Sequence, residues 1–335
     1  MISSALHRQS VVVAVALVAT AMAAAPARAI VLGRLVPSGA GEGAAVARVS
    51  SARLACSGVL VAPRLVLLAL HCLQPSSDPA DPNLGLRGRV AIGDPNGARP
   101  VIDRHVVSVL TPTPPSAPPG ATAGELDIAG LVLDRAVTSP PVSLLAVPTP
   151  APGSPVVVVG FGAHTSPPPA TLSRTTSLRE AALSLADCGG LPSPLPDSPY
   201  VGCAVAAGAP FAGIPPGSAC EGDSGGPVLA VAPKGPPVLV GIVSRGQSGC
   251  PVGGGNVFTS VTGTQAALQG LLHTPLPAPS PIPRRCGRYR RTLAQLGRRL
   301  SIERRARPRR GTARRRLVRS EAARSRLAAV VHEHC

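Results

Sequence analysis

Apolar residues occur along most of this chain in short runs of strand length, separated by segments rich in proline and glycine. The runs 57–61 and 65–68 are joined by Ala62-Pro63-Arg64, which predicts a β-hairpin. Further apolar runs cover 127–133, 156–159 and 238–243. With 40 prolines and 36 glycines, long uninterrupted helices are disfavoured over most of the chain. The pattern predicts mainly β structure, in one or two domains for 335 residues.

The N-terminal end follows a different pattern. Residues 11–25 are an unbroken run of 15 apolar or small side chains, and Ala27-Arg28-Ala29 places small residues where a signal peptidase cuts. We therefore expect residues 1–29 to be a secretory signal peptide and the mature protein to be extracellular, with association to the cell surface as an option. A membrane anchor is the alternative, but a spanning helix needs roughly 20 apolar residues.

The C-terminal end differs again. Residues 273–283 alternate proline with other residues, which is typical of a semi-rigid extended linker. Beyond this linker, residues 284–335 carry leucines at helical spacing, interrupted by a proline and a glycine (Leu293, Leu296, Leu300, Pro308 and Gly311). We expect two short helices that fold back on each other, with the leucines inside and the arginines outside.

Charge separates the same segments. Hydrophobic residues make up 44% of the chain, which excludes a wholly disordered protein. Residues 284–335, the basic tail, hold 18 arginines and three glutamates, whereas residues 30–283 carry no net charge. The tail predicts attachment to an anionic polymer or surface, such as a cell-wall polymer, lipid headgroups or nucleic acid. A solvated extension that only aids secretion is the alternative. Sequence-specific nucleic-acid recognition has no support, because Tyr289 is the only aromatic residue of the tail.

The most specific string for chemistry is Cys220-Glu221-Gly222-Asp223-Ser224-Gly225-Gly226-Pro227. A serine hydroxyl is a poor nucleophile unless a base takes its proton and N–H donors hold the resulting oxyanion. His71 is the candidate base, because Cys72 follows it and lies 16 residues after Cys56, so that a disulfide between them would fix its loop. Asp127 opens an apolar run and is the candidate carboxylate that orients the imidazole. Asp134, at the other end of that run, is expected to be a solvated turn residue.

In this order and spacing, the motifs resemble those of trypsin/chymotrypsin-like serine proteases. The matching motifs are Ile30-Val31, Cys56-Ser57-Gly58, His71-Cys72, Asp127-Ile128-Ala129, Gly160-Phe161-Gly162, Gly222 to Pro227, Gly241 to Gly246 and Val257-Phe258-Thr259. The resemblance implies an all-β protease domain over residues 30–272. Its fold would be two packed six-stranded antiparallel β-barrels, with the site in the cleft between them.

The resemblance also implies roles for individual residues. Ser224 would be the nucleophile, His71 the general base, and Asp127 the orienting carboxylate. The N–H groups of Gly222 and Ser224 would form the oxyanion hole, and the Ser244 hydroxyl would hydrogen-bond the aspartate. We therefore expect a serine endopeptidase that acts on peptide or protein substrates as a monomer. A catalytically impaired homologue that works as a surface-binding protein is the alternative.

Eight cysteines in an exported chain indicate four disulfides, although the residues alone leave 105 pairings open. The resemblance implies three of them, Cys56–Cys72, Cys188–Cys203 and Cys220–Cys250. Cys286 and Cys335 remain, one near each end of the basic tail, and they would meet in an antiparallel helical hairpin. An intermolecular bridge or two free thiols are the alternatives. The terminal residues 332–335 (His-Glu-His-Cys) favour a solvated chain end over a metal cluster, and we expect neither a metal nor a cofactor.

The specificity pocket is read from the resemblance as well. The residue six positions before the nucleophile, here Ser218, would lie at the base of the pocket, with Gly246 and Asn256 beside it. No aspartate is present to pair with a lysine or arginine of the substrate, so we expect an uncharged residue before the scissile bond (P1). Arg245 stands where the family commonly has tryptophan, which keeps a preference for acidic residues open as an alternative.

Activation in this family uses a new N-terminal amine that pairs with the aspartate before the nucleophile, here Asp223. Ile30 directly follows Ala29, so removal of the signal peptide would expose the amine of Ile30 without a further cut. An earlier cut that leaves a short propeptide is the alternative. Two departures from the family bear on the site. Leu70 precedes His71 where alanine is usual and could displace the imidazole, and Leu32 replaces a glycine.

Overall fold

The computed structural model describes the chain in segments. These are residues 30–37, 41–50, 55–73, 89–93, 101–112, 125–139, 141–142, 150–164, 177–191, 195, 198–230, 236–251, 253–279, 284–305, 319–321 and 323–325. The expected signal peptide, residues 1–29, lies outside the described residues.

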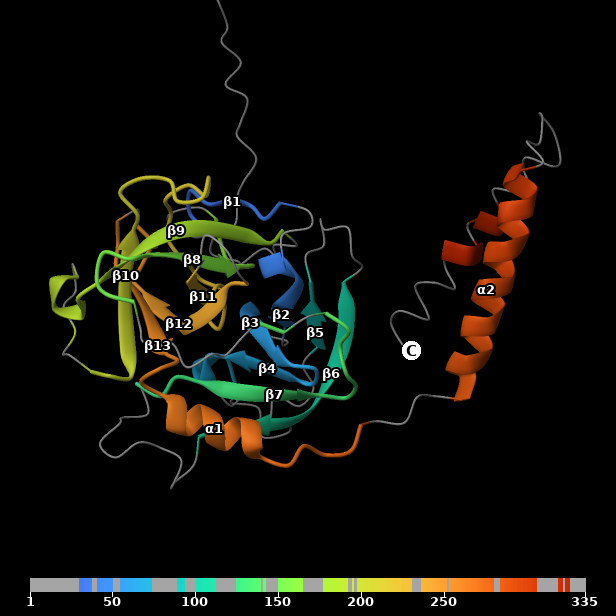
Figure 1. Cartoon of the computed structure of the whole chain (residues 1–335), viewed down its shortest axis with the longest axis horizontal. Coiled ribbons are helices and arrows are strands. Elements are labelled where there is room, and N and C mark those ends of the chain that lie inside the picture. The colour runs from blue at the N-terminus through green and yellow to red at the C-terminus, as the bar shows by residue number, and fades with distance from the viewer. Residues whose placement is uncertain are drawn as a thin grey trace, which may run out of the picture.

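The N-terminal barrel is closed by six antiparallel strands in the order β2-β3-β4-β7-β6-β5 (Figure 1). These strands are β2 (Val46–Ser50), β3 (Ala55–Ala62), β4 (Leu65–Leu68), β5 (Arg89–Ile92), β6 (Ile102–Leu110) and β7 (Ala129–Leu133). The predicted hairpin is confirmed, because β3 pairs with β4 across the turn at Pro63 and Arg64. Aliphatic side chains such as Leu60, Leu67 and Leu131 are fully buried and build the core in place of aromatic residues.

The C-terminal barrel also has six antiparallel strands, in the order β8-β9-β10-β13-β12-β11, and β11 returns to β8. These are β8 (Pro155–Gly160), β9 (Arg179–Ala186), β10 (Val201–Ala206), β11 (Pro227–Ala230), β12 (Val238–Gly246) and β13 (Asn256–Ser260). The short β1 (Arg34–Leu35) adds to the edge of β9. Phe258 fills the interior so closely that a Cβ at Gly202 or Gly241 would lie 2.2 or 2.1 Å from its ring.

Strand β8 connects the cores of the two barrels. Val156 and Val158 pack with Phe258 in the C-terminal barrel. Val157 and Val159 pack in the cluster that contains the interior of the N-terminal barrel. Successive strand residues point to opposite faces, so a strand buried on both faces reads as a continuous apolar run. The two barrels are therefore one packed unit with a cleft between them.

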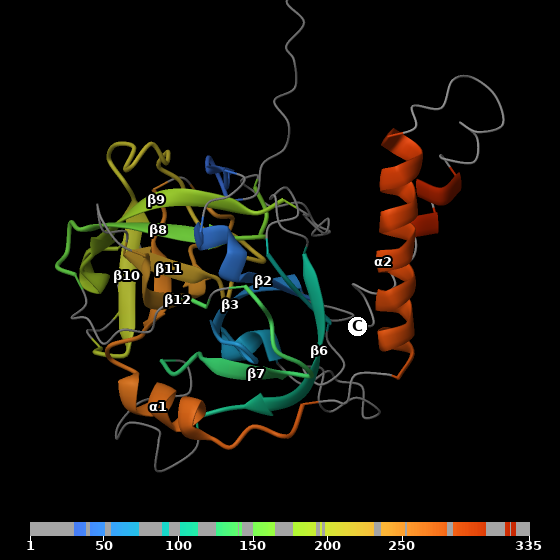
Figure 2. The ribbon, with the colours of Figure 1, turned by 45° about the vertical axis from the view of Figure 1, so that its right-hand side comes forward.

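A helix that the sequence analysis does not predict follows the second barrel. Helix α1 (Gln265–His273) lies beside β7 in both views of the ribbon (Figure 2), and its Leu268 and Leu271 join the core cluster. After α1, Leu276 packs on the same cluster, and the carbonyl of Pro277 accepts a hydrogen bond from Arg64 Nη1 at 2.8 Å. The first half of the expected linker is thus held on the N-terminal barrel.

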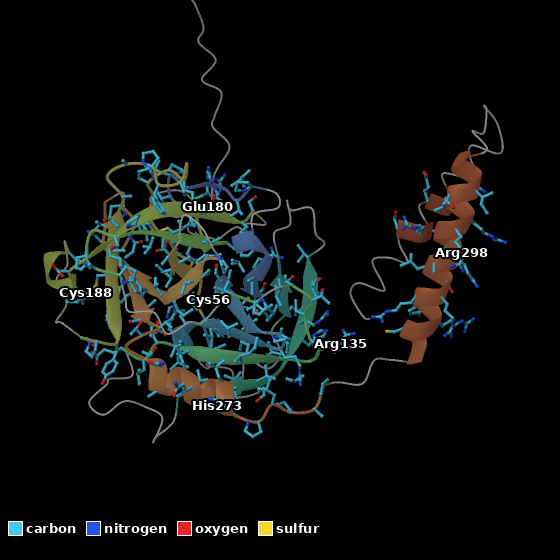
Figure 3. All side chains as sticks on the ribbon, in the orientation of Figure 1. Cys56, Arg135, Glu180, Cys188, His273 and Arg298 are labelled. Carbon is cyan, nitrogen blue, oxygen red and sulfur yellow. A yellow bond between two sulfur atoms is a disulfide. The ribbon has the colours of Figure 1, made fainter. Side chains whose placement is uncertain are left out.

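The basic tail contains helix α2 (Arg284–Arg305). Cys286 and Leu300 are buried on one side of α2, whereas the side chain of Arg298 projects outward (Figure 3). Arg324 Nε lies 3.7 Å from the position that a Cβ on Gly297 would take, so the Arg324 side chain lies against α2. The first predicted tail helix is therefore confirmed. Cys286 is disulfide-bonded.

The other predictions for the tail concern residues that the structure does not describe. Pro308, Gly311 and Cys335 lie outside the described residues, as does the cluster 332–335. Within the described part of the chain, neither α1 nor α2 combines the length and apolar character that crossing a membrane requires.

Candidate active site

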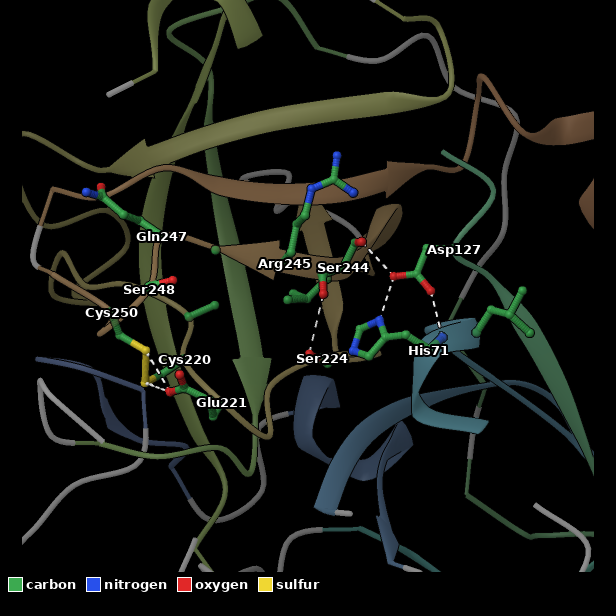
Figure 4. A pocket seen from close by; sticks show the side chains of 14 residues that line it. His71, Asp127, Cys220, Glu221, Ser224, Ser244, Arg245, Gln247, Ser248 and Cys250 are labelled. Atoms are coloured by element: carbon green, nitrogen blue, oxygen red, sulfur yellow. Dashed lines mark hydrogen bonds and ion pairs between the residues drawn. A yellow bond between two sulfur atoms is a disulfide. The ribbon is translucent and has the colours of Figure 1, made fainter. Parts of the chain in front are cut away.

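Three elements of the two barrels bring the expected triad residues to one cleft of about 640 Å³ (Figure 4). His71 lies on the short helix η2 (Leu70–Leu73), which the Cys56–Cys72 disulfide ties to β3. Asp127 stands two residues before β7. Ser224 lies in the turn that precedes β11. The cleft therefore collects residues that are as far as 153 positions apart in sequence.

The Asp127 carboxylate holds His71 at two points. Its Oδ1 accepts the backbone N–H of His71 at 2.8 Å, and its Oδ2 lies 2.7 Å from His71 Nδ1. The Ser244 hydroxyl donates to the same Oδ2 at 2.6 Å. Burial alone raises the pKa of Asp127, but the hydrogen bonds from His71 and Ser244 outweigh it and hold that pKa below its usual value. Asp127 is therefore ionised at neutral pH and fixes the imidazole with Nδ1 inward and Nε2 toward the cleft.

Leu70 does not displace the imidazole from Asp127. The Leu70 side chain is partly buried, packs against the core cluster and lines the cleft. The two short contacts between His71 and Asp127 are retained beside it. The extra volume relative to alanine is thus accommodated by packing against the core.

The Ser224 hydroxyl lies beside His71 in the cleft. It donates to the carbonyl of Ser244 at 3.4 Å, and among the described residues no hydrogen bond joins it to His71. Catalytic hydrogen bonds are often long or misaligned without substrate. Proton transfer to His71 Nε2 therefore requires the hydroxyl to turn away from the Ser244 carbonyl.

The backbone N–H groups of Gly222 and Ser224 are candidates for the oxyanion hole. Within the described part of the chain, neither the N–H of Gly222 nor that of Ser224 donates a hydrogen bond, whereas the N–H groups of Asp223, Gly225 and Gly226 all do. Gly222 has φ of 93°, a conformation that strains any residue with a side chain. The pair is what an oxyanion hole needs: two preorganised donors beside the nucleophile.

Ser57 is a residue of this site that the sequence analysis treats only as part of a motif. Its buried hydroxyl donates to the carbonyl of Gly222 at 2.9 Å and accepts the N–H of Phe161 at 3.0 Å. Its own N–H donates to the carbonyl of Ser224 at 2.9 Å. Ser57 therefore fixes the Gly222–Ser224 loop through the carbonyl groups of Gly222 and Ser224. The only advance signal is its place after Cys56.

Asp223 is fully buried directly behind Ser224. Its carboxylate accepts the N–H groups of Gly162 at 2.7 Å and Cys220 at 3.0 Å. A Cβ at Gly162 would lie 2.5 Å from the carboxyl carbon, so only glycine lets the backbone approach this closely. Burial raises the pKa of Asp223 to about 7, against the lowering effect of the hydrogen bonds from Cys220 and Gly162. The site therefore lacks a cation among its described partners.

The segment that begins at Ile30 is docked on the C-terminal barrel. Ile30 is fully buried in the core of that barrel. Val31 and Ser218 exchange two backbone hydrogen bonds of 3.1 Å, which tie this segment to the expected base of the pocket. Arg34 Nε donates to Glu180 at 2.8 Å. Leu32 has φ of 62°, the left-handed region that explains why the family has glycine there.

The expected pocket residues divide into two groups. Gly246 and Ala219 line the cleft. Ser218 and Asn256 are buried beneath it, where the Ser218 hydroxyl donates to Asn256 Oδ1 at 3.1 Å and the Ala219 N–H donates to the same oxygen at 2.9 Å. Ser218 and Asn256 are thus neutral groups that bond each other next to Ala219, and neither lines the cleft.

One expectation is wrong. Asp134 is not a solvated turn residue but is buried, and it accepts the N–H of His105 on β6 at 3.2 Å and Arg135 Nε at 3.1 Å. An acidic residue at the end of an apolar run looks like a turn residue in the sequence. In the folded chain, β6 covers Asp134, and the His105 N–H of β6 supplies a hydrogen bond to the buried carboxylate. Asp134 does not line the cleft.

The three disulfides implied by the resemblance are present: Cys56–Cys72, Cys188–Cys203 and Cys220–Cys250. The sulfur atoms near His71 and near Glu221 belong to two of these bonds, so they are not thiolate ligands for a metal.

The comparison with protein families agrees with this geometry. The family model described as Trypsin matches residues 30–268. This chain belongs to the trypsin family. The match ends at residue 268, within α1 and before the basic tail begins. As a trypsin-family protein, the chain is of the serine-protease type, and its substrates are of the peptide or protein class.

Proposed function

We propose that this protein is a secreted serine endopeptidase that works through Ser224, His71 and Asp127. The observation that carries the proposal is the hydrogen-bonded chain from Ser244 through Asp127 to His71. Beside it, the N–H groups of Gly222 and Ser224 donate no hydrogen bond within the described part of the chain. The leader of residues 1–29 and the disulfides support export.

In the proposed reaction, Ser224 Oγ attacks the scissile carbonyl carbon while its proton moves to Nε2 of His71. The N–H groups of Gly222 and Ser224 hold the oxyanion, and the Asp127 carboxylate stabilises the imidazolium. The C–N bond then breaks as His71 gives the proton to the leaving amine, which leaves an ester on Ser224. Water attacks this ester, again with His71 as base, and restores the serine.

We further propose that the P1 residue is uncharged and of small to medium size. Ser218 and Asn256 satisfy each other by hydrogen bonding, so an incoming lysine or arginine would meet no counter-charge from these two residues. Burying a cation without a partner is costly. A Cβ placed on Gly246 would lie 3.6 Å from its nearest neighbour, the carbonyl oxygen of Gly255. This uncrowded position at Gly246 admits a substrate side chain from the cleft.

Activation is proposed to follow from a cut before Ile30. The new ammonium would pair with the buried Asp223 carboxylate and would supply the cation that this carboxylate lacks among its described partners. Because Val31 is bonded to Ser218, docking of this segment would also order the base of the pocket. N-terminal sequencing of the secreted, active protein should begin at Ile30, and an active form that begins upstream would refute direct activation.

The basic tail is proposed to hold the enzyme on an anionic polymer or surface. Helix α2 carries nine arginines in 22 residues, and its buried side carries the disulfide-bonded Cys286 and Leu300. Packing on one side leaves the arginines on the other side exposed, as for Arg298. A chain that ends at residue 283 should hydrolyse peptides like the full chain and lose its retention on a phosphate resin. Equal retention of both chains would refute the role of the tail.

The protease itself is tested by peptide hydrolysis with the mature full-length chain. Ser224→Ala, His71→Ala and Asp127→Ala should each lower kcat by about 10⁴-fold or more, and a double variant should lose little beyond the single ones. His105→Ala is the matched histidine control, because His105 does not line the cleft. Full activity in the Ser224 or His71 variant contradicts the assignment. An inert wild-type protein supports the alternative, an impaired homologue that binds surfaces.

A further inference from the structure

Arg245 occupies an unusual place on β12. Successive residues of a strand normally point to opposite faces, yet both Ser244 and Arg245 line the cleft. The register between β12 and β13 shifts between Val243 and Arg245, which marks an irregularity at Ser244. Such bulges re-aim side chains next to active sites. Ser244 can thus reach Asp127 while the exposed Arg245 still borders the cleft.

The two exposed charged side chains of the cleft lie apart from each other. Asp127 is buried and fully engaged with His71 and Ser244, so the exposed charged side chains lining the cleft, among the described residues, are Arg245 and Glu221. Glu221 Oε2 lies 2.9 and 3.0 Å from the sulfurs of the Cys220–Cys250 disulfide. Figure 4 shows the Arg245 guanidinium at the other side of the cleft, above Ser244. The two charges therefore border different parts of a bound substrate.

The edge of β12 next to Arg245 is open to a peptide. Among the described residues, pairing with β11 on this edge ends at Ile242, and the backbone–backbone hydrogen bonds to the preceding turn end at Val243. The carbonyl of the next residue, Ser244, accepts the Ser224 hydroxyl at 3.4 Å. On the other edge, β13 stays paired through Gly246. A peptide can therefore add to Ser244–Gly246 as an extra antiparallel strand. If P1 enters between Ala219 and Gly246, the residues before P1 run along this edge.

We propose that Arg245 is a specificity-determining residue that selects an acidic side chain two to four positions before the scissile bond (P2–P4). An exposed guanidinium binds a carboxylate by charge-assisted, bidentate hydrogen bonds. The neutral base of the pocket leaves P1 uncharged, so the acidic residue is read beside the pocket and not inside it. This inference rests on the proposed protease function and names its substrate class.

The test uses fluorogenic peptides with one uncharged P1 residue and glutamate or glutamine at P2, P3 or P4. For the mature full-length enzyme, kcat/KM for glutamate should exceed that for glutamine about fivefold in at least one position, in line with the strength of exposed ion pairs. Arg245→Gln should bring this ratio close to one, and Arg245→Glu should invert it. Because the pair is exposed, 0.5 M salt should also weaken the preference.

Arg89→Gln is the matched control. It removes one positive charge from an exposed side chain of β5 that does not line the cleft, so the ratio of wild type should persist. A wild-type enzyme that cleaves the glutamine peptides but shows no preference, or an unchanged ratio in Arg245→Gln, overturns the role of Arg245 alone. A protein that cleaves none of the peptides overturns the protease function as well.

Discussion

The buried carboxylate of Asp223 predicts how the folding stability of the uncleaved chain depends on pH. Without a cation, burial raises the pKa of Asp223 from 3.8 to about 7. At 1.36 kcal/mol per pKa unit, this shift corresponds to about 4 kcal/mol of folding free energy. Below pH 3.8, the carboxyl is neutral in both the folded and the unfolded chain. As the pH rises toward 7, the unfolded chain ionises first, so stability is lost across this window.

The assay compares two forms of the chain in urea unfolding at pH 4 and pH 7, both carrying Ser224→Ala to prevent self-digestion. The form that retains residues 26–29 should lose about 3 kcal/mol more between these pH values than its Asp223→Asn counterpart, because pH 4 and pH 7 span most of the shift but not all of it. In the form that starts at Ile30, the ammonium should pair with the carboxylate, so this extra loss should disappear. The same extra loss in both forms would show that the amine does not reach Asp223. No extra loss in the longer form would show that the Asp223 carboxylate is not raised in pKa by burial.

Three further predictions concern residues near the site. Leu32→Gly should stabilise the protein by about 1 kcal/mol in thermal unfolding, because it relieves the left-handed backbone; lower stability would contradict the strain. Ser57→Ala should cost about 2 kcal/mol, because the Gly222 carbonyl loses its buried donor, and an unchanged melting temperature would dismiss this contact. Ser218→Asp combined with Asn256→Gly should move P1 preference toward arginine in a peptide library. Cleavage mainly after arginine by the wild type would show that the pocket is misaligned.

The barrels could be predicted from the sequence because their strands are short, apolar and bounded by proline and glycine. The run 156–159 is an example, since burial on both faces of β8 makes every residue apolar. Helix α1 was missed although Leu268 and Leu271 lie at helical spacing. Its apolar face is short, and the barrel that it covers is not visible in the local pattern.

The site residues differ in how much a local motif reveals. Ser224 and His71 stand in specific motifs, and their neighbours in sequence help to shape the site. Ser57 acts on Gly222, a partner 165 residues away, so only the folded chain reveals its role. Asp134 was misread for the same reason, because β6 supplies the hydrogen bond that allows its burial. Asn256 was placed at the pocket, but its hydrogen bond to Ser218 depends on the tertiary structure.

The central claim, an activated Ser224, is tested most directly by covalent labelling. The mature chain is treated with a fluorophosphonate probe, which reacts with serines that a neighbouring base activates. Intact-mass analysis and peptide mapping should find one adduct, on Ser224, that is absent in Ser224→Ala and forms far more slowly in His71→Ala. No adduct on the folded wild-type protein, or an adduct on another serine, would contradict the account.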